Sequence, residues 1–239
     1  MTEPLLRVDG LVAGYGQLQA VRGVSFEVGA GEALAVIGEN GAGKTTLFHS
    51  VCGLHDAASG EVVFGGERLL GTPAHQVVRR GIALVPEGRR IFPSLTVDEN
   101  LRVAEDQHRR ARRHGAPRWT RDRIYQLFPD LGPARRRGGH QISGGQQQML
   151  AIGRALLSEP RLLLLDEVSL GLSPVVVKVL YQALARIRAD GVTLVFVEQD
   201  VHRALAFSDH LVCLHKGTVR LSGGSRGRAL DEVRRAYFG

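Results

Sequence analysis

Gly38-Glu39-Asn40-Gly41-Ala42-Gly43-Lys44-Thr45-Thr46 is the stretch that decides how this 239-residue chain folds. It fits the pattern G-x-x-x-x-G-K-[ST] of a phosphate-binding loop. Its glycines let the backbone turn tightly, so that main-chain N–H groups can point at a polyphosphate. Lys44 would add a mobile charge for the β- and γ-phosphates, and the hydroxyl of Thr45 would be a Mg²⁺ ligand. The sequence therefore predicts a site for the phosphates of a nucleotide.

The residues on both sides of this loop support that interpretation. Residues 33–37 form a short apolar run, which is typical of a fully buried strand. After the loop, apolar residues recur at helical spacing as far as Leu54, and Gly53 is a candidate helix end. A glycine-rich turn that matches by chance is the alternative, and it is disfavoured because the full motif lies between a strand and a helix.

Composition limits the class of protein. A chain of 239 residues with 44% hydrophobic residues suits one α/β core with an inserted subdomain. No apolar run is long enough to cross a bilayer, and the first residues lack a secretion signal, so we expect a soluble, cytoplasmic product. Cys52 and Cys213 are expected to be reduced, buried thiols.

The net charge of +7 comes almost entirely from arginine, because lysine occurs only at positions 44, 178 and 216. Arginine clusters lie within residues 109–113, 118–123 and 135–137. Nucleic-acid binding is one interpretation of such a balance. However, aromatic residues make up only 5% of the chain and do not alternate with the arginines. We favour two other interpretations of the positive charge: a solvated face near anionic lipid headgroups, or a plain compositional preference for arginine. We expect no nucleic-acid partner.

Further strands and helices are predicted along the chain. Short strands are expected at residues 5–8, 24–28, 61–64 and 82–85. Thr72-Pro73 should open a helix, with Pro73 in its first turn, that stops at Gly81. From Thr96, with Glu99 as the partner in a capping box, the chain should be largely helical to about residue 128, with a break near Gly115 and Pro117.

Ser143-Gly144-Gly145-Gln146 is a second candidate anion site. Ser143 and Gln146 have the spacing of a capping box, so a helix should begin here. Two glycines destabilise a first helical turn, but they make sense if a phosphate must approach that backbone. An ordinary capped helix is the better interpretation when this segment is taken alone.

Two adjacent acids follow the apolar run at residues 162–165. The run suits a strand buried on both faces, and its carboxyl end is where open α/β sheets bind ligands. Asp166 would hold Mg²⁺, and Glu167 would orient or activate the attacking water. Solvated acids at a strand exit are the alternative, which the phosphate-binding loop disfavours. A helix over residues 176–187, a strand over 192–197, another helix, a hairpin and a helix over 229–238 complete the expected order.

With its motifs in this order, the chain resembles the ATP-binding-cassette (ABC) ATPases from end to end. Tyr15 matches the aromatic residue that stacks on adenine, although taken alone it would be interpreted as a surface packing residue of a loop. Residues 38–45 match the Walker A loop. Ile142-Ser143-Gly144-Gly145-Gln146 is similar to the signature sequence, and residues 162–166 to Walker B. Glu167 falls at the catalytic glutamate and residues 169–172 at the D-loop.

More narrowly, the chain resembles the ATP-binding subunits of branched-chain amino acid importers of the LivF type. The stretches that carry this likeness are residues 85–90, 92–97, 147–156, 197–199 and 236–239. Glu87 stands where a glutamine is usual near Mg²⁺, and Arg89 or Arg90 would balance its charge. Gln199 replaces the switch histidine and could still donate to a γ-phosphate oxygen. Val168 replaces a proline, and the sequence does not explain that change.

The resemblance implies a single ABC ATPase domain over residues 1–239. Its α/β core, of the P-loop NTPase (RecA-like) type, would span residues 1–88 and 158–239, with an N-terminal antiparallel β subdomain. An α-helical subdomain would be inserted at about residues 89–157. Two such chains would pack head to tail, each ATP lying between the phosphate-binding loop of one and the Ser143 helix of the other.

The implied function is ATP hydrolysis, with Mg²⁺, at the cytoplasmic face of the cell membrane, where it would energise the uptake of branched-chain amino acids. Expected partners are transmembrane permease subunits, a second ATPase subunit (the same chain or a LivG-type chain) and, indirectly, a substrate-binding protein. A urea or short-amide importer is an alternative. A non-transport ABC protein would usually have two fused cassettes or a long coiled-coil insertion, which this chain lacks. An inactive scaffold is disfavoured because Lys44, Asp166 and Glu167 are all present.

Overall fold

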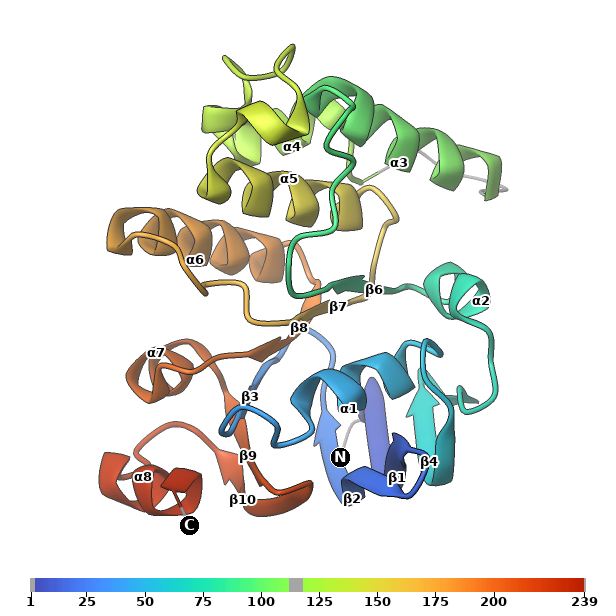
Figure 1. Ribbon diagram of the computed structural model, residues 1–239, viewed down its shortest axis with the longest axis vertical. Helices are drawn as coiled ribbons and strands as arrows, with labels where there is room; N and C mark the ends of the chain where they lie inside the picture. Colours follow the sequence, from blue (N-terminus) through green and yellow to red (C-terminus); the bar gives the residue numbers. More distant parts are fainter. Residues whose placement is uncertain (1–2, 112–117, 239) are drawn as a thin grey trace.

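Two β-sheets and a layer of helices make up the chain (Figure 1). The computed structural model describes residues 3–111 and 118–238. In Figure 1 the helical layer with α3, α4 and α5 lies at one end of the long axis, and the sheet that contains β1, β2 and β4 lies at the other end. No helix within the described ranges is long and apolar enough to cross a membrane.

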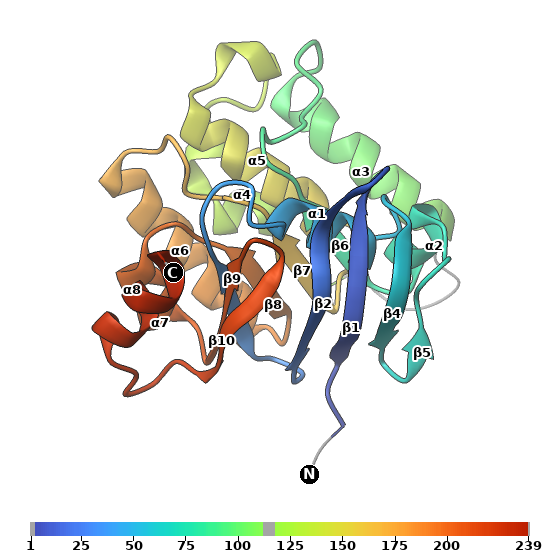
Figure 2. The same ribbon diagram turned by 60° about the horizontal axis from the view of Figure 1, so that its bottom comes forward.

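The smaller sheet is antiparallel and has the order β2-β1-β4-β5 (Figure 2). Its strands are β1 (Leu6–Tyr15), β2 (Leu18–Val28), β4 (Ala57–Phe64) and β5 (Glu67–Arg68). The predicted strands at residues 5–8 and 24–28 were too short. Gly10 and Gly23 have φ of 55° and 69°, and the pairing of β1 with β2 shifts register beside them. These bulges let the ladder continue past glycines that looked like strand ends.

The larger sheet has the order β10-β9-β3-β8-β7-β6. Its parallel strands are β3 (Ala33–Ile37), β6 (Ile82–Val85), β7 (Leu162–Leu165), β8 (Thr193–Val197) and β9 (His210–His215), and β10 (Thr218–Gly224) is the antiparallel edge. Every residue of β3, β7 and β8 is buried, as expected for the apolar runs of a parallel sheet covered on both faces. The carboxyl ends of these three strands lie at one edge, where the predicted site residues follow them.

Helices surround the larger sheet. They are α1 (Lys44–Val51), α2 (Ala74–Arg79), α6 (Pro174–Ala189), α7 (Val201–Phe207) and α8 (Leu230–Phe238). The predicted position of Pro73 in the first turn of α2 was wrong. Its ψ of 143° is extended, so Pro73 is the residue before the helix. Proline disfavours the helical region for the residue preceding it but can itself occupy the extended region, as it does here.

The remaining helices lie within residues 89–157. They are α3 (Val97–Ala111), α4 (Arg121–Leu127) and α5 (Gly144–Leu156), with short 3₁₀ turns at Pro129–Leu131 and Gly139–Gln141. The predicted capping box at α3 is confirmed, since the Thr96 N–H donates to Glu99 Oε2 at 2.8 Å and the Glu99 N–H to Thr96 Oγ1 at 3.2 Å. The break predicted at Gly115 and Pro117 lies outside the described residues.

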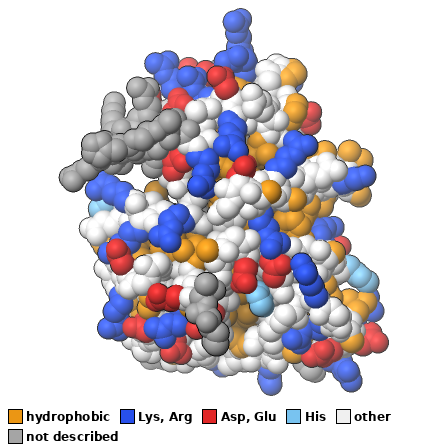
Figure 3. Space-filling view, turned by 180° about the vertical axis from the view of Figure 1, so that it is seen from behind, with side chains coloured by type: hydrophobic (Ala, Val, Ile, Leu, Met, Phe, Trp, Pro, Cys, Tyr) orange, Lys and Arg blue, Asp and Glu red, His pale blue; other side chains and the backbone are white. Residues whose placement is uncertain are grey.

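The larger sheet separates two hydrophobic cores. Alternate residues of β3 point to opposite faces: Ala33, Ala35 and Ile37 join the core with α5 and α6, whereas Leu34 and Val36 join the core with the smaller sheet and α1. Cys52 and Cys213 are both buried and free, as predicted. On the face shown in Figure 3, arginine and lysine side chains are interspersed with acidic ones.

Candidate nucleotide-binding site

The phosphate-binding loop connects β3 to α1 and packs tightly against two strands. A Cβ atom at Gly38 would lie 2.3 Å from the carbonyl oxygen of Leu214 in β9, and one at Gly43 would lie 2.2 Å from that of Ala20 in β2. The φ angles of Gly38 and Gly43 are 150° and 102°. Both positions therefore require glycine, because any side chain would push the loop away from its neighbours.

Lys44 lies inside this loop and is only 5% exposed. Its Nζ donates to the carbonyl oxygens of Gly38 at 2.8 Å and Glu39 at 2.9 Å, and lies 3.8 Å from Glu167 Oε1. Burial lowers the pKa of Lys44, while the charges of Glu167, Asp166 and Glu87 act to raise it. The ammonium group is thus held at the edge of the sheet, close enough to interact electrostatically with Asp166, Glu167 and Glu87.

Asp166 follows β7 and is buried, and neither of its carboxylate oxygens has a hydrogen-bond partner among the residues that the structure describes. Burial raises the pKa of Asp166, and the charges of Glu167 and Glu87 raise it further. The charge of Lys44 and the nearby Thr45 hydroxyl, which is outside hydrogen-bond geometry with either carboxylate oxygen, act to lower it. A buried carboxyl group without donors is costly, so these oxygens are suited to a cation.

Mg²⁺ fits the residues present at this position. It prefers hard oxygen ligands, and proteins usually bind it through one or two carboxylates together with substrate phosphates and water. The unpartnered Asp166 oxygens and the Thr45 hydroxyl are ligands of that kind. No cluster of three or more His, Cys, Asp or Glu side chains able to hold a metal occurs in residues 3–111 or 118–238.

Glu167 and Gln199 meet at the carboxyl ends of β7 and β8. Gln199 Nε2 donates to Glu167 Oε2 at 3.0 Å. Glu167 has a φ of 51°, which is uncommon for a residue with a side chain and costs conformational energy. The structure therefore gives Gln199 a protein partner in addition to the γ-phosphate contact predicted for it.

Ser143 begins α5, and its predicted capping box is confirmed. Its Oγ accepts from the Gln146 N–H at 3.2 Å, and its own N–H donates to Gln146 Oε1 at 3.0 Å. Gly145 lies close to α6, since a Cβ there would be 2.7 Å from Val176 Cγ1. In Figure 1 the helical layer that holds α5 is separate from the loop between β3 and α1, so one chain presents two distinct candidate phosphate sites.

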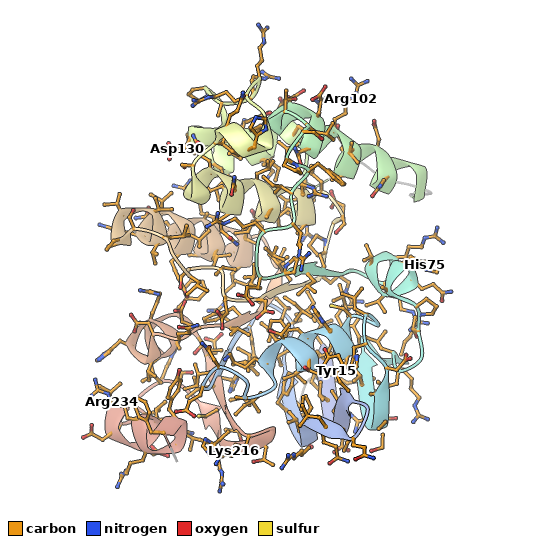
Figure 4. The ribbon with its side chains drawn as sticks, in the orientation of Figure 1. Tyr15, His75, Arg102, Asp130, Lys216 and Arg234 are labelled. Atoms are coloured by element: carbon orange, nitrogen blue, oxygen red, sulfur yellow. The ribbon has the colours of Figure 1, made fainter. Side chains whose placement is uncertain are left out.

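Tyr15 lies at the end of β1, near α1 (Figure 4). The residue is 55% exposed, and the centre of its ring lies 4.4 Å from the centre of the His55 ring, at an interplanar angle of 36°. The Nε2 atom of His55 lies 2.9 Å from the Gly14 carbonyl oxygen, which fixes the histidine beside the tyrosine. An exposed, supported aromatic ring can accept a base, and the adenine contact stays a prediction.

Arg89 hydrogen-bonds to α5, and the balance of the Glu87 charge by Arg89 or Arg90 stays a prediction. Its guanidinium group donates to Gln147 Oε1 in α5 at 2.8 Å, rather than to Glu87. Arg89 and Arg90 have φ of 65° and 47°, and this tight turn directs the Arg89 side chain toward α5. Glu87 is exposed, and its charge affects both Lys44 and Asp166.

One residue of this edge was missed as a functional candidate. Glu198 follows β8 in the way that Asp166 follows β7, and it is buried with several donors around it. The rule that identified Asp166, polar residues at the carboxyl end of a buried strand, also applied to Glu198. In the sequence analysis Glu198 appeared only within residues 197–199, a stretch that resembles the family. Its hydrogen-bond partners were not predictable because they come from distant segments of the chain.

Comparison with known proteins gives consistent matches. The family model described as ABC transporter matches residues 21–169. The high-affinity branched-chain amino acid transport ATP-binding protein BraG of Pseudomonas aeruginosa is 41% identical, over 98% of this chain and all of that protein. The probable branched-chain amino acid transport ATP-binding protein LivF of Archaeoglobus fulgidus is 34% identical, over 92% of each.

Solved structures agree on the fold. A nucleotide-free ATP-binding cassette from an ABC transporter superposes with a TM-score of 0.82 at 24% identity, covering 99% of this chain and 96% of that one. These matches confirm the fold class predicted from the sequence. They also confirm the resemblance to ABC ATPases on which that prediction rested.

Proposed function

Because this chain belongs to the ABC transporter family, we propose that it is the ATP-hydrolysing subunit of an importer of branched-chain amino acids. The observation that carries the proposal is the meeting of Lys44, Asp166 and Glu167 at one sheet edge beside the phosphate-binding loop. The substrate class rests on similarity to relatives named for this transport, BraG among them.

In the proposed reaction each side chain has a separate task. Lys44 and the loop N–H groups bind the β- and γ-phosphates, and Thr45 and Asp166, with Glu87 nearby, hold Mg²⁺. When bound, Mg²⁺ offsets the negative charge of the phosphates. Glu167 takes the proton of the attacking water, and Gln199 holds the Glu167 carboxylate in place through the 3.0 Å hydrogen bond.

A second cassette completes the site in this proposal. The N-terminus of α5, with its free N–H groups and two glycines, suits the γ-phosphate of an ATP bound to a second chain. Two chains packed head to tail then enclose two nucleotides, each between one phosphate-binding loop and one Ser143 helix. The isolated chain pairs with itself, and in a complete importer the second cassette is the same or a related chain.

A groove suits the membrane subunits. A cavity of about 700 Å³ lies between α2, β6, α3 and α5, and its wall combines apolar Val78 and Val103 with basic side chains, namely His75, Arg79, Arg89, Arg90 and Arg154. We assign this groove to a cytoplasmic helix of the permease. Its arginine-rich and partly apolar lining would suit a helix that carries acidic and apolar residues. This docking would hold the chain at the cytoplasmic face of the membrane.

The test is uptake by proteoliposomes that contain this chain and the permease subunits encoded next to it, with a substrate-binding protein present. ATP-dependent uptake of labelled leucine, lost in Lys44→Ala, is the expected result. Uptake of urea but not leucine would overturn the substrate class, and Lys44→Ala with unaltered ATP binding would overturn the assignment of the loop. Val78→Asp should weaken retention of the chain by the permease while leaving its own ATP affinity unchanged.

A further inference from the structure

Glu198 is 2% exposed, yet its carboxyl group accepts hydrogen bonds from several segments of the chain. The donors are Ser169 Oγ (2.8 and 3.0 Å), Tyr181 Oη (2.6 Å), the N–H groups of Gln199 (3.2 Å) and Asp200 (3.1 Å), and Arg203 Nη1 (2.9 Å). Since every partner donates, the carboxyl group is an acceptor fixed from all sides.

Apart from Tyr181, which belongs to α6, these donors lie in the two segments that follow β7 and β8 and carry Glu167 and Gln199. Ser169 lies two residues after Glu167, and Gln199 follows Glu198 directly. Arg203 Nη1 also donates to Ser169 Oγ at 3.1 Å, so the two segments are joined twice. A cavity of about 190 Å³ is lined by both segments, with Glu167, Ser169, Gln199 and Arg203 in its wall.

Tyr181 connects this cluster to the core. Its ring packs edge-on against Phe207 at 4.9 Å and Phe196 at 6.2 Å between ring centres. Burial, followed by the nearby Glu198, raises the pKa of the Tyr181 hydroxyl, so it keeps its proton and donates at any physiological pH. The tyrosine is therefore a rigid donor that reaches from α6 to the end of β8.

We infer that Glu198 is a positioning residue for ATP hydrolysis, with Tyr181 as its anchor. By holding the segment after β7 against the segment after β8, Glu198 sets the hydrogen bond from Gln199 to Glu167. This inference rests on the proposed function, because it acts through the two residues assigned to the attacking water.

Packing alone does not explain this arrangement. A buried carboxyl group needs donors, but any nearby N–H groups would satisfy it. Here Ser169 and Arg203, two of its side-chain donors, connect the segments that carry Glu167 and Gln199. Glu167 also has the unfavourable φ of 51°. Backbone in such a conformation persists only where its surroundings hold it. The Leu170 N–H donates to the Glu167 carbonyl oxygen at 3.1 Å, and Ser169, between these two residues, is tied to Glu198.

The first test replaces Tyr181 by phenylalanine, which removes one hydroxyl group and keeps the ring. We expect kcat for ATP to fall about tenfold or more, because the catalytic geometry loosens, while KM and ATP affinity stay within about twofold. Tyr125→Phe is the matched control, since Tyr125 Oη donates to Asp98 Oδ1 at 2.9 Å in the helical layer. That variant should keep the wild-type kcat.

The second test is a double-mutant cycle with Gln199→Ala. If Tyr181 and Glu198 act through Gln199, Tyr181→Phe should lower kcat little further in the Gln199→Ala background. Ser169→Ala, in place of Tyr181→Phe, gives the same cycle should the phenylalanine variant be poorly folded.

An unchanged kcat in Tyr181→Phe, or independent effects in the cycle, would overturn the inference and leave the proposed function intact. Loss of ATP affinity in Tyr181→Phe that matches the loss in kcat would also overturn it, because a purely structural role predicts that pattern. A wild-type chain that neither binds nor hydrolyses ATP would instead defeat the proposed function itself.

Discussion

Glu167 is the side chain on which hydrolysis should depend most strongly. Glu167→Gln keeps the shape and the hydrogen bond with Gln199 but cannot take a proton, so kcat should fall by roughly 10²- to 10⁴-fold with ATP still bound. Phosphate release and nucleotide binding measure the two effects. Glu159→Gln is a matched control, because Glu159 also has a positive φ, 56°, and its carboxyl group accepts from the Trp119 N–H. Equal turnover in both variants would refute the assigned base.

Asp166 should make the nucleotide-free protein less stable at neutral pH. Its folded-state pKa is raised, so its contribution is most favourable below its unfolded pKa of about 4 and is lost as pH rises through the folded pKa. Asp166→Asn should therefore stabilise the protein at pH 7 without Mg²⁺ by roughly 1–3 kcal/mol, and the gain should shrink as pH falls toward about 4.

Thermal unfolding of wild type and Asp166→Asn at several pH values measures this difference. Addition of Mg-ATP should reverse the order, because only the wild type can hold the cation at this position. A gain that is independent of pH, or equal stabilisation of both proteins by Mg-ATP, would contradict the assignment of Asp166 as a metal ligand.

At the scale of elements, the close packing of α3, α4 and α5 depends on a glycine. A Cβ atom at Gly153 would lie 2.6 Å from Ile124 Cγ2 and 3.2 Å from Leu101 Cδ2. Gly153→Ala should destabilise the protein by about 1–3 kcal/mol through overpacking, despite the better helix propensity of alanine. Ile124→Ala should relieve the clash, so the double variant should be more stable than the sum of the single effects predicts. Additive losses in denaturant unfolding would show that the clash is not the cause.

Elements were predictable where a local pattern determines them. Residues 33–37 and 82–85 coincide with β3 and β6, because continuous apolar runs mark strands buried on both faces. The capping boxes at Thr96 and Ser143 were also readable, since both partners lie three residues apart. The lengths of β1 and β2 were not predictable. A glycine bulge interrupts a strand unless a neighbouring strand pairs with the residues on both sides of it, and the sequence does not show that pairing.

Site residues follow the same division between local and distant partners. Lys44, Asp166 and Glu167 belong to motifs whose spacing reveals them. The cluster around Glu198 joins β8 to a loop 29 residues earlier and to a helix residue 17 earlier, and only the folded chain brings these together. The hydrogen bond from Arg89 was not predictable for the same reason, since its partner Gln147 is 58 residues away.

At the scale of the whole molecule, the central claim is that one chain supplies two half-sites and a second chain completes them. Lys44→Ala disables the phosphate-binding loop. Ser143→Asp keeps an N-capping side chain at α5 but places a negative charge where the phosphate would bind. Each variant alone should be inactive, because both sites of its symmetric pair contain the defect.

Mixing the two variants in equal amounts is the most direct test. In a mixed pair, the phosphate-binding loop of the Ser143→Asp chain faces the unchanged N-terminus of α5 in the Lys44→Ala chain. One of the two nucleotide sites is then built entirely from wild-type residues. With half of the pairs mixed and one of two sites intact in each, ATP turnover should recover to about a quarter of the wild-type value. Turnover in the mixture no higher than that of the separate variants, or full turnover by Ser143→Asp alone, would contradict the claim.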